Sequence, residues 1–319
     1  MLDRRQLLSG AAIAGGALAL PLTVRNAAAQ ATDASTQAPA FHKMKVGDIE
    51  VTALADGHLS LGAQVFPETS EDEFAAAMEA AYLPAGAYTA PVNAYLVTTG
   101  DRTILIDAGG SAAMAPSLGK LAENLAAAGA STDAVDTVLI THLHPDHIGG
   151  LSDGDSAAFA NAEIMVREEE AQFWTDPATR EALPDGFKPM FDGVGRTLGL
   201  YDGRVTRFAD DGEKAPGVEA VFLPGHTPGH TGFRVTSGDD ALLVWGDIVH
   251  AAPLQMPHPR AFIGFDTAPE MAVETRMKLL DEVATDRVMV AGMHMPFPGF
   301  GFIAPDGDGY RFVRTDWQY

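Results

Sequence analysis

Residues 140–150 read Ile-Thr-His-Leu-His-Pro-Asp-His-Ile-Gly-Gly, and this stretch decides the fold of the 319-residue chain. Three histidines and one aspartate fall within six positions, directly after the apolar run Asp136–Ile140. The run predicts a buried strand, and Gly149 and Gly150 allow the loop behind it to turn into a helix. The pattern therefore predicts a buried strand followed by a tight loop that carries several polar side chains.

These polar side chains form two pairs. His142 and His144 leave the end of the strand, and Asp146 and His147 follow in the turn, where they can face a second ion. Imidazole and carboxylate together suit Zn²⁺ or a similar borderline ion, and two pairs at this spacing suit two ions better than one. The sequence therefore predicts a metal centre.

Two metal ions need more than four ligands, and the chain offers more. Three later apolar runs have the composition of strands and lead into histidine or aspartate. In chain order they are Val218–Leu223 before His226 and His230, Ala241–Trp245 before Asp247, and Arg287–Ala291 before His294. One of the first two histidines can bind a metal, and a carboxylate such as Asp247 could bridge both ions.

The pattern resembles that of the metallo-β-lactamase-fold hydrolases. Their His-x-His-x-Asp-His signature and later ligands match His142, His144, Asp146, His147, His226, Asp247 and His294. The resemblance implies an α/β fold, an αββα sandwich of two mixed sheets packed face to face with helices outside. It also implies two Zn²⁺ ions per chain, or other divalent ions on the same donors. One ion would be held by His142, His144 and His226, the other by Asp146, His147 and His294, with Asp247 shared and His230 left out.

The likeness is closer to one branch, which contains methyl parathion hydrolase and related lactonases, and extends from about Phe41 to Tyr310. It implies a homodimer and an aromatic pocket wall at Trp174. The chain departs from this branch at Met114, where the organophosphate hydrolase has an aromatic residue, and in the segment 250–260. The resemblance therefore leaves the substrate open.

Composition narrows the choice of function. Lys and Arg number 21 against 43 Asp and Glu, a formal net charge of −22, so a nucleic-acid backbone would be repelled. The chain has no cysteine, which excludes disulfides, thiolate ligands and cysteine nucleophiles. With 46% hydrophobic residues, one domain over residues 41–319 can bury a large core.

The N-terminus predicts an exported protein. Arg4 and Arg5 precede the apolar stretch Ala11–Val24, and small residues follow at 27–31, as in a Tat-type signal peptide over residues 1–31. The apolar stretch is short for a spanning helix, so we expect no stable membrane span after cleavage, although an uncleaved anchor is the alternative. Residues 32–40 then form a flexible lead-in to a periplasmic or secreted domain.

Past the lead-in, strands and helices alternate in two halves. The predicted strands are Ile49–Ala55, Asn93–Thr98, Thr103–Asp107, Thr137–Thr141, Glu163–Arg167, Val218–Leu223, Gly232–Thr236, Ala241–Trp245 and Arg287–Ala291. The predicted helices are Glu71–Ala81, Leu118–Ala128, Glu168–Trp174 and Pro269–Ala284. Residues 175–215, rich in Pro, Gly and Asp, are predicted to form a lid or insertion.

Two ions held close together can share a hydroxide, the nucleophile for an ester, lactone or phosphotriester. Asp146 and Asp247 are the candidate catalytic carboxylates, because one can orient that hydroxide and the other bridges the ions. Asp107 is a candidate partner that holds a ligand histidine from behind, or else caps a turn. Candidate pocket residues are Trp174, Met114, Phe191 and His250.

These features predict a metal-dependent hydrolase that acts on an ester-like bond of a neutral, hydrophobic small molecule. The substrate would be a lactone or an organophosphate triester, between which the sequence does not choose. Alternatives on the same fold are a thioester or β-lactam hydrolase and an iron-dependent oxidoreductase. The iron alternative needs only one occupied metal site, whereas the chain offers ligands for two.

Overall fold

The structure is a computed structural model that describes residues 37–316. The predicted signal peptide, residues 1–31, lies outside the described residues, as does the lead-in up to residue 36. Among residues 37–316, no helix combines the length and the apolar character that crossing a bilayer requires.

Most of the first half of the chain forms a seven-stranded sheet in the order β1-β2-β3-β4-β5-β8-β9. Strands β1 to β4 pair antiparallel, and β4, β5, β8 and β9 pair parallel. Their bounds are β1 Phe41–Val46, β2 Ile49–Leu61, β3 Tyr88–Thr99, β4 Arg102–Ile106, β5 Thr137–Leu139, β8 Glu163–Arg167 and β9 Val205–Phe208. A short ribbon of β6 (Ser152–Asp153) and β7 (Ser156–Ala157) stands apart from this sheet.

The second half forms another seven-stranded sheet in the order β10-β11-β12-β13-β14-β15-β16. Its only parallel pair is β13 with β14. The bounds are β10 Gly212–Ala215, β11 Val218–Phe222, β12 Thr231–Ser237, β13 Asp240–Val244, β14 Met289–Ala291, β15 Gly301–Asp306 and β16 Gly309–Arg314. Both sheets are therefore mixed, as the resemblance implied.

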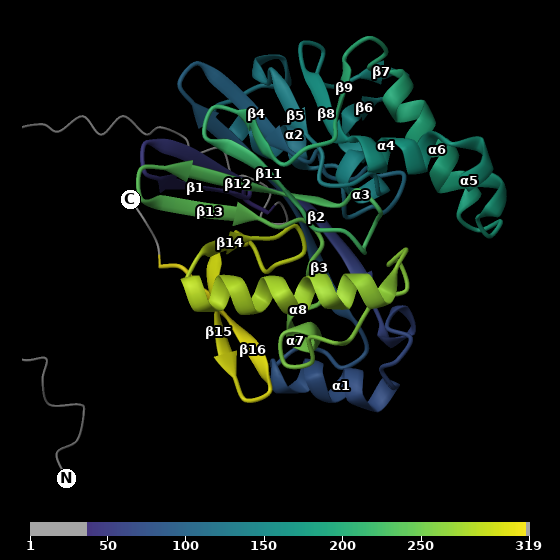
Figure 1. Ribbon diagram of the computed structural model, residues 1–319, viewed down its shortest axis with the longest axis vertical. Coiled ribbons are helices and arrows are strands. Elements are labelled where there is room, and N and C mark those ends of the chain that lie inside the picture. The colour runs from purple at the N-terminus through teal and green to yellow at the C-terminus, as the bar shows by residue number, and fades with distance from the viewer. Residues whose placement is uncertain (1–36, 317–319) are drawn as a thin grey trace, which may run out of the picture. The chain divides into compact units, whose positions relative to one another are not determined.

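Helices cover the outer faces of the two sheets (Figure 1). Apolar side chains of α2, α4 and α6 pack on the first sheet, and those of α8 pack on the second. The helices are α1 Glu71–Ala80, α2 Leu121–Ala127, α3 Pro145–Ile148, α4 Glu168–Thr175, α5 Pro177–Ala182, α6 Lys188–Gly199, α7 Ala252–Gln255 and α8 Pro269–Asp286. Single 3-10 turns lie at Ala63–Val65, Thr132–Ala134 and Gly149–Leu151.

Alternation of side chains along the strands creates the layers. In β4, Ile104 and Ile106 enter the apolar cluster between the sheets, whereas Leu105 enters the cluster under α2. Phe233 and Val244 of the second sheet belong to the same cluster between the sheets as Ile104 and Ile106. Because successive strand residues point to opposite faces, a fully apolar strand is buried on both sides. The predicted αββα sandwich is confirmed.

The predicted elements are present, with differences at their ends and in the connections. Strand β2 continues past Ala55 to Leu61 through a register shift between Ala55 and Gly57. Residues 175–215, predicted to form a lid or insertion, contain α5, α6, β9 and β10. Seven short strands were not predicted, namely β1, β6, β7, β9, β10, β15 and β16. All seven lie at or next to sheet edges, where hydrophobic patterning is weakest.

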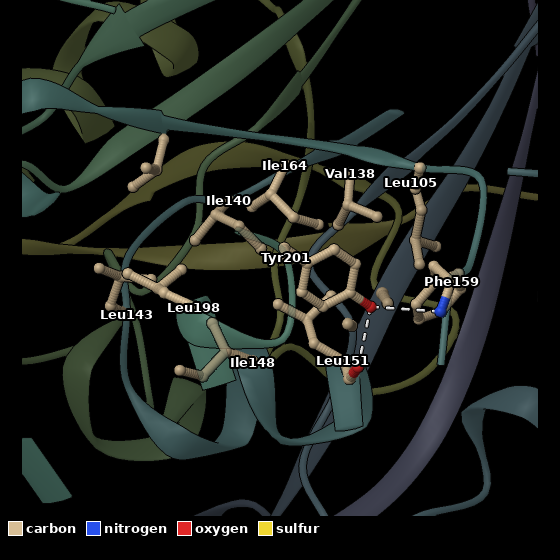
Figure 2. Packing of buried hydrophobic residues seen from close by; sticks show 14 of the residues in the cluster. Leu105, Val138, Ile140, Leu143, Ile148, Leu151, Phe159, Ile164, Leu198 and Tyr201 are labelled. Atoms are coloured by element: carbon tan, nitrogen blue, oxygen red, sulfur yellow. Dashed lines mark hydrogen bonds between the residues drawn. The ribbon is translucent and has the colours of Figure 1, made fainter. Parts of the chain in front are cut away.

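Tyr201 anchors the apolar cluster outside the first sheet (Figure 2). Its ring is buried among Leu105, Val138 and their neighbours, and its hydroxyl reaches two backbone groups. The hydroxyl donates to the carbonyl of Leu151 at 2.8 Å and accepts from the amide of Phe159 at 3.2 Å. It therefore satisfies two buried groups in the segment around β6 and β7.

Changing Tyr201 to phenylalanine should destabilise the fold without altering the metal centre. The apolar contacts remain, and the carbonyl of Leu151 still accepts from the amide of Ala158 at 2.9 Å. The buried amide of Phe159 loses its partner, which costs about 1–3 kcal/mol. Urea denaturation followed by circular dichroism measures the change in the free energy of unfolding. Tyr82, whose side chain is 98% exposed, supplies the matched control, and Tyr82→Phe should leave stability within about 0.5 kcal/mol of the parent. Equal stability of the two variants would contradict the assignment.

Candidate metal centre

Strand direction brings the predicted ligands to one edge of the sandwich. Strands β4 and β5 run parallel, so the residues after them, among them Asp107 and His142, lie at the same end of the first sheet. In the second sheet β11, β13 and β14 share one direction, so His226, Asp247 and His294 also follow strand ends on one side. The seven residues come together although they are far apart in the chain.

Three imidazoles converge on one point. His142 Nε2 and His226 Nε2 each lie 3.0 Å from His144 Nδ1, and all three side chains are buried. Zinc–nitrogen bonds of 2.0–2.1 Å in a tetrahedron place ligand atoms about 3.3 Å apart. The spacing of the three ring nitrogens is therefore close to that of ligands around a single ion.

A second group lies beside the first. Asp146 Oδ2 is 3.5 Å from His147 Nε2 and 3.4 Å from His294 Nε2. Asp247 Oδ2 is 3.2 Å from His147 Nε2 and 3.1 Å from His294 Nε2, and it also lies 3.6 Å from His142 Nε2. One carboxylate oxygen therefore reaches both groups, which is the position that a bridging ligand occupies.

The donor set fits a pair of divalent cations. The buried atoms His147 Nε2 and Asp247 Oδ1 have no hydrogen-bond partner, although nearly all buried polar atoms in proteins do. Burial lowers the pKa of His142 and of His144 well below the usual value, so both rings stay neutral and can donate a lone pair. Burial would raise the pKa of the Asp247 carboxyl, but the neighbouring histidines hold it well below its usual range.

Three of the ligand histidines are held from behind. His147 Nδ1 lies 2.7 Å from Asp107 Oδ2, His226 Nδ1 lies 2.7 Å from Asp266 Oδ1, and His294 Nδ1 lies 2.7 Å from the carbonyl of Pro91. Such partners fix the tautomer that leaves Nε2 free for a metal. Asp107 thus makes the predicted contact with a ligand histidine, and its other oxygen accepts from the amide of Thr141 at 2.8 Å. Asp266 was not foreseen, since no strand or motif precedes it.

His230 has a structural place beside the ligands. Its Nδ1 donates to the carbonyl of Leu223 at 2.8 Å, and its Nε2 accepts from the amide of Asp247 at 2.9 Å. Both ring nitrogens are therefore occupied, in agreement with its omission from the ligand set. The close approach also requires Gly246, where φ is +62° and a Cβ atom would lie 2.4 Å from His230 Nε2.

Glu170 is a functional residue that the sequence did not reveal. Its buried carboxylate accepts from the amide of Leu143 at 2.9 Å and from Trp174 Nε1 at 2.8 Å through one oxygen. Its other oxygen accepts from the amide of Gly229 at 2.9 Å. Leu143 lies between two ligands of the first sheet, and Gly229 lies in the loop of His226. One side chain therefore ties the two ligand-bearing loops together.

A cavity of about 450 Å³ opens over the metal ligands. Its floor contains His144, Asp146, His226, Asp247 and His294, and its walls are mostly apolar. Two of the predicted pocket residues line it, Met114 and His250, and His250 Nε2 lies 3.2 Å from Asp247 Oδ2. The wall residues that the sequence did not single out for the pocket include Leu59, Leu61, Val65, Met190 and Ile263.

The other two predicted pocket residues, Trp174 and Phe191, are placed in the core. Trp174 is 1% exposed and Phe191 is 7% exposed, and both belong to the apolar cluster outside the first sheet. The Trp174 ring stands edge-on to that of His144, with ring centroids 5.6 Å apart. Its indole N–H donates a hydrogen bond to the carboxylate of Glu170. It supports a ligand from behind, so the prediction that it forms a pocket wall is wrong. Phe187 and Phe265 provide the aromatic walls instead.

The fold and the candidate metal centre together define the superfamily to which the protein belongs. Residues 87–304 match the profile of the Metallo-beta-lactamase superfamily, and the chain belongs to that superfamily. Among solved structures, the hydrolase AbOPH of the beta lactamase superfamily has a TM-score of 0.84 and 31% identity, covering 89% of this chain and 100% of that chain. AidC, a dizinc quorum-quenching lactonase, has a TM-score of 0.83 and 25% identity, covering 88% of this chain and 99% of its own.

Curated relatives give a similar result from sequence. An N-acyl homoserine lactonase of Bacillus cereus is 24% identical over 229 residues, which are 65% of this chain and 82% of the relative. The anti-Pycsar protein Apyc1 of Paenibacillus sp. (strain J14) is 31% identical over 154 residues. That match spans 46% of this chain and only 57% of Apyc1. The chain is thus similar to hydrolases of this superfamily, with lactonases prominent among them.

Proposed function

We propose that the protein is a dinuclear zinc hydrolase that opens the ester bond of a neutral, hydrophobic lactone. The observation that carries the proposal is the position of Asp247 Oδ2 between two groups of ligands, on the floor of an apolar cavity. The similarity to lactonases, including one named as dizinc, supports both the metal and the substrate class.

Two zinc ions, when bound here, would lower the pKa of the water that they hold to about 7 and polarise the substrate oxygen. The chain itself orients the reactants. Asp146 and Asp247 both line the floor of the cavity, where a carboxylate can hold the attacking oxygen's proton in place. The apolar walls exclude water and receive the hydrophobic body of the substrate.

His250 is the polar group best placed to contact the substrate. Its ring lines the cavity beside Asp247, and the amide of His250 is held by Gln255 Oε1 at 2.7 Å. A neutral imidazole has one N–H, which can donate to a carbonyl or leaving-group oxygen above the floor. We therefore assign His250 to the binding of the oxygen of the reacting ester.

Charge favours a neutral substrate. None of the described residues that line the cavity is lysine or arginine, so an anionic substrate would find no counter-ion on its walls. The net charge of −22 adds long-range repulsion. An aryl phosphotriester is also neutral and apolar, and it is the second candidate that these walls would admit.

The first experiment compares these two substrate classes. Purified protein loaded with zinc should hydrolyse N-hexanoyl homoserine lactone with a kcat/KM at least tenfold above that for an aryl phosphotriester, as measured by proton release. A higher kcat/KM for the phosphotriester would make phosphotriesters, rather than lactones, the proposed substrate class. The proposal of a hydrolase would be overturned if neither substrate were hydrolysed. It would also be overturned if the protein contained about one iron per chain and consumed dioxygen.

Two further expectations are proposals about the whole protein. We propose that residues 1–31 direct export to the periplasm or outside the cell, on the strength of Arg4, Arg5 and the apolar stretch behind them. Mass spectrometry of the protein recovered from its native compartment would show whether the chain begins near residue 32. We also propose a homodimer, which light scattering would test.

A further inference from the structure

Asp56 is a buried carboxylate that the metal centre does not use. It lies on β2, at the register shift between Ala55 and Gly57, and its side chain is fully buried. It belongs to none of the groups of candidate metal ligands. A buried carboxylate is costly unless hydrogen-bond donors surround it, so the partners of Asp56 show what it does in the fold.

The partners of Asp56 are backbone amides at the two ends of residues 110–119, which we call the cavity loop. Asp56 Oδ2 accepts from the amide of Gly110 at 2.9 Å and from that of Gly119 at 3.1 Å. Asp56 Oδ1 accepts from the amide of Leu121, just beyond the loop, at 3.0 Å. One carboxylate therefore holds the two ends of the cavity loop together.

The cavity loop has few other contacts that could fix its position. Between residues 111 and 118, only the side chain of Leu118 is buried. Ser117 Oγ donates to the carbonyl of His58 at 2.5 Å, close to the same end of the loop. Hydrogen bonds to an ionised acceptor are about twice as strong as those between neutral groups. The bonds to Asp56 are therefore the main contacts that position the cavity loop.

The cavity loop contributes one side chain to the cavity over the metal ligands. Of the described residues 110–119, only Met114 lines that cavity, and it is 45% exposed. A hydrophobic substrate in the cavity would cover this side chain. Such an apolar contact is made equally in the bound substrate and in the transition state, so its position affects KM more than kcat.

We propose that Asp56 is a positioning residue for substrate binding, because it holds both ends of the cavity loop and thereby fixes Met114 in the cavity wall. Asp56 does not itself line the cavity, so its effect on the substrate passes through the loop. The inference adds a residue outside the cavity to the proposed function, and it rests on that function for its kinetic test.

The kinetic test uses Asp56→Asn in the zinc-loaded protein. Asparagine keeps the size of the side chain but replaces one acceptor oxygen by an NH₂ group, so at least one amide of the loop loses its partner. KM for N-hexanoyl homoserine lactone should rise at least fivefold, while kcat changes less than threefold and zinc content stays that of the parent. Tyr201→Phe, which unpairs a buried amide outside the loop, is the matched control and should leave KM and kcat within twofold.

A double-mutant cycle tests whether Asp56 acts through Met114. In a Met114→Ala background, Asp56→Asn should raise KM less than twofold, because the contact that Asp56 positions is already lost. An equal rise of KM in both backgrounds would overturn the proposal. An unchanged KM in the single variant, or a loss of kcat as large as the rise of KM, would overturn it as well.

Hydrogen exchange followed by mass spectrometry gives a readout that does not depend on turnover. Peptides that cover residues 109–121 should exchange at least tenfold faster in Asp56→Asn than in the parent, whereas peptides that cover His226 and His294 should be unchanged. This pattern supports the role of Asp56 even when no lactone is hydrolysed, a result that would overturn the proposed function only. Parent-like exchange of residues 109–121 would overturn the role of Asp56.

A second variant covers the case in which Asp56→Asn does not fold by circular dichroism. Asp56→Glu keeps the charge but moves the carboxylate by one methylene, so it cannot hold both ends of the cavity loop in the same place. It then replaces Asp56→Asn and faces the same kinetic and exchange criteria.

Discussion

Replacing Asp247 by asparagine should remove both bound metal and activity. Its Oδ2 lies 3.1–3.6 Å from ring nitrogens of both ligand groups, so one neutralised side chain weakens two metal positions at once. Partners that only hold a ligand from behind typically contribute 10–100-fold to metal affinity or activity. A shared ligand should contribute more, and we expect kcat/KM for the lactone to fall by more than about 100-fold.

Metal analysis accompanies the kinetics in this comparison. We expect about two zinc ions per parent chain and fewer than one in the Asp247→Asn protein after gel filtration in metal-free buffer. Asp240→Asn, an exposed change at the start of strand β13, which leads to Asp247, is the matched control and should retain both metal and activity. Full metal content with full activity in the Asp247 variant would refute the bridging assignment.

Changing Glu170 to glutamine should weaken metal binding, although Glu170 is not itself one of the candidate metal ligands. Three N–H donors, from Leu143, Trp174 and Gly229, converge on the two carboxylate oxygens. Glutamine offers one oxygen and one NH₂ group, so at least one buried donor must face another donor. Leaving such a donor unpaired costs about 1–3 kcal/mol of folding free energy. Because the loops of His142 and His226 then separate, zinc affinity should fall about 10–100-fold.

Competition with a chelator measures that affinity, and cobalt substitution reports ligand geometry through its visible spectrum. A changed spectrum would show that the ligands have moved, which a loss of stability alone would not produce. Glu168→Gln on the same helix is the control, because that side chain is 44% exposed and makes only a 3.4 Å ion pair with Arg207. Parent-like affinity and an unchanged spectrum in the Glu170 variant would refute its positioning role.

The sequence predicted which side chains come together at the candidate metal centre, because each of the strand-end residues follows an apolar run. His142, His226 and His294 leave strands whose fully apolar character already implies burial, so their place at one edge of the sandwich followed from strand direction. Asp107 was found for the same reason, since it ends the run before it. The edge strands were missed because only part of their surface is buried, as in β1, where Phe41 remains 38% exposed.

Residues that act across loops could not be predicted in this way. Glu170 sits in a run of three glutamates at a helix start, a pattern that ordinarily indicates a solvated N-terminal turn. Asp266 follows no periodic segment at all. Trp174 was misplaced because an aromatic residue beside a site packs equally well as a wall or as a support. The burial of Trp174 and its hydrogen bond to Glu170 decide between these two roles.

The ligands also determine when during folding the centre can exist. They span the chain from His142 to His294 and follow strands of both sheets, so neither half alone presents either complete group of candidate ligands. Contacts so distant in sequence form late, after the loops between them have closed. Metal would then bind only after the two halves of the chain have packed together. A cation that binds only the folded chain stabilises it in proportion to the logarithm of its free concentration, so the midpoint of thermal unfolding becomes a measure of metal supply.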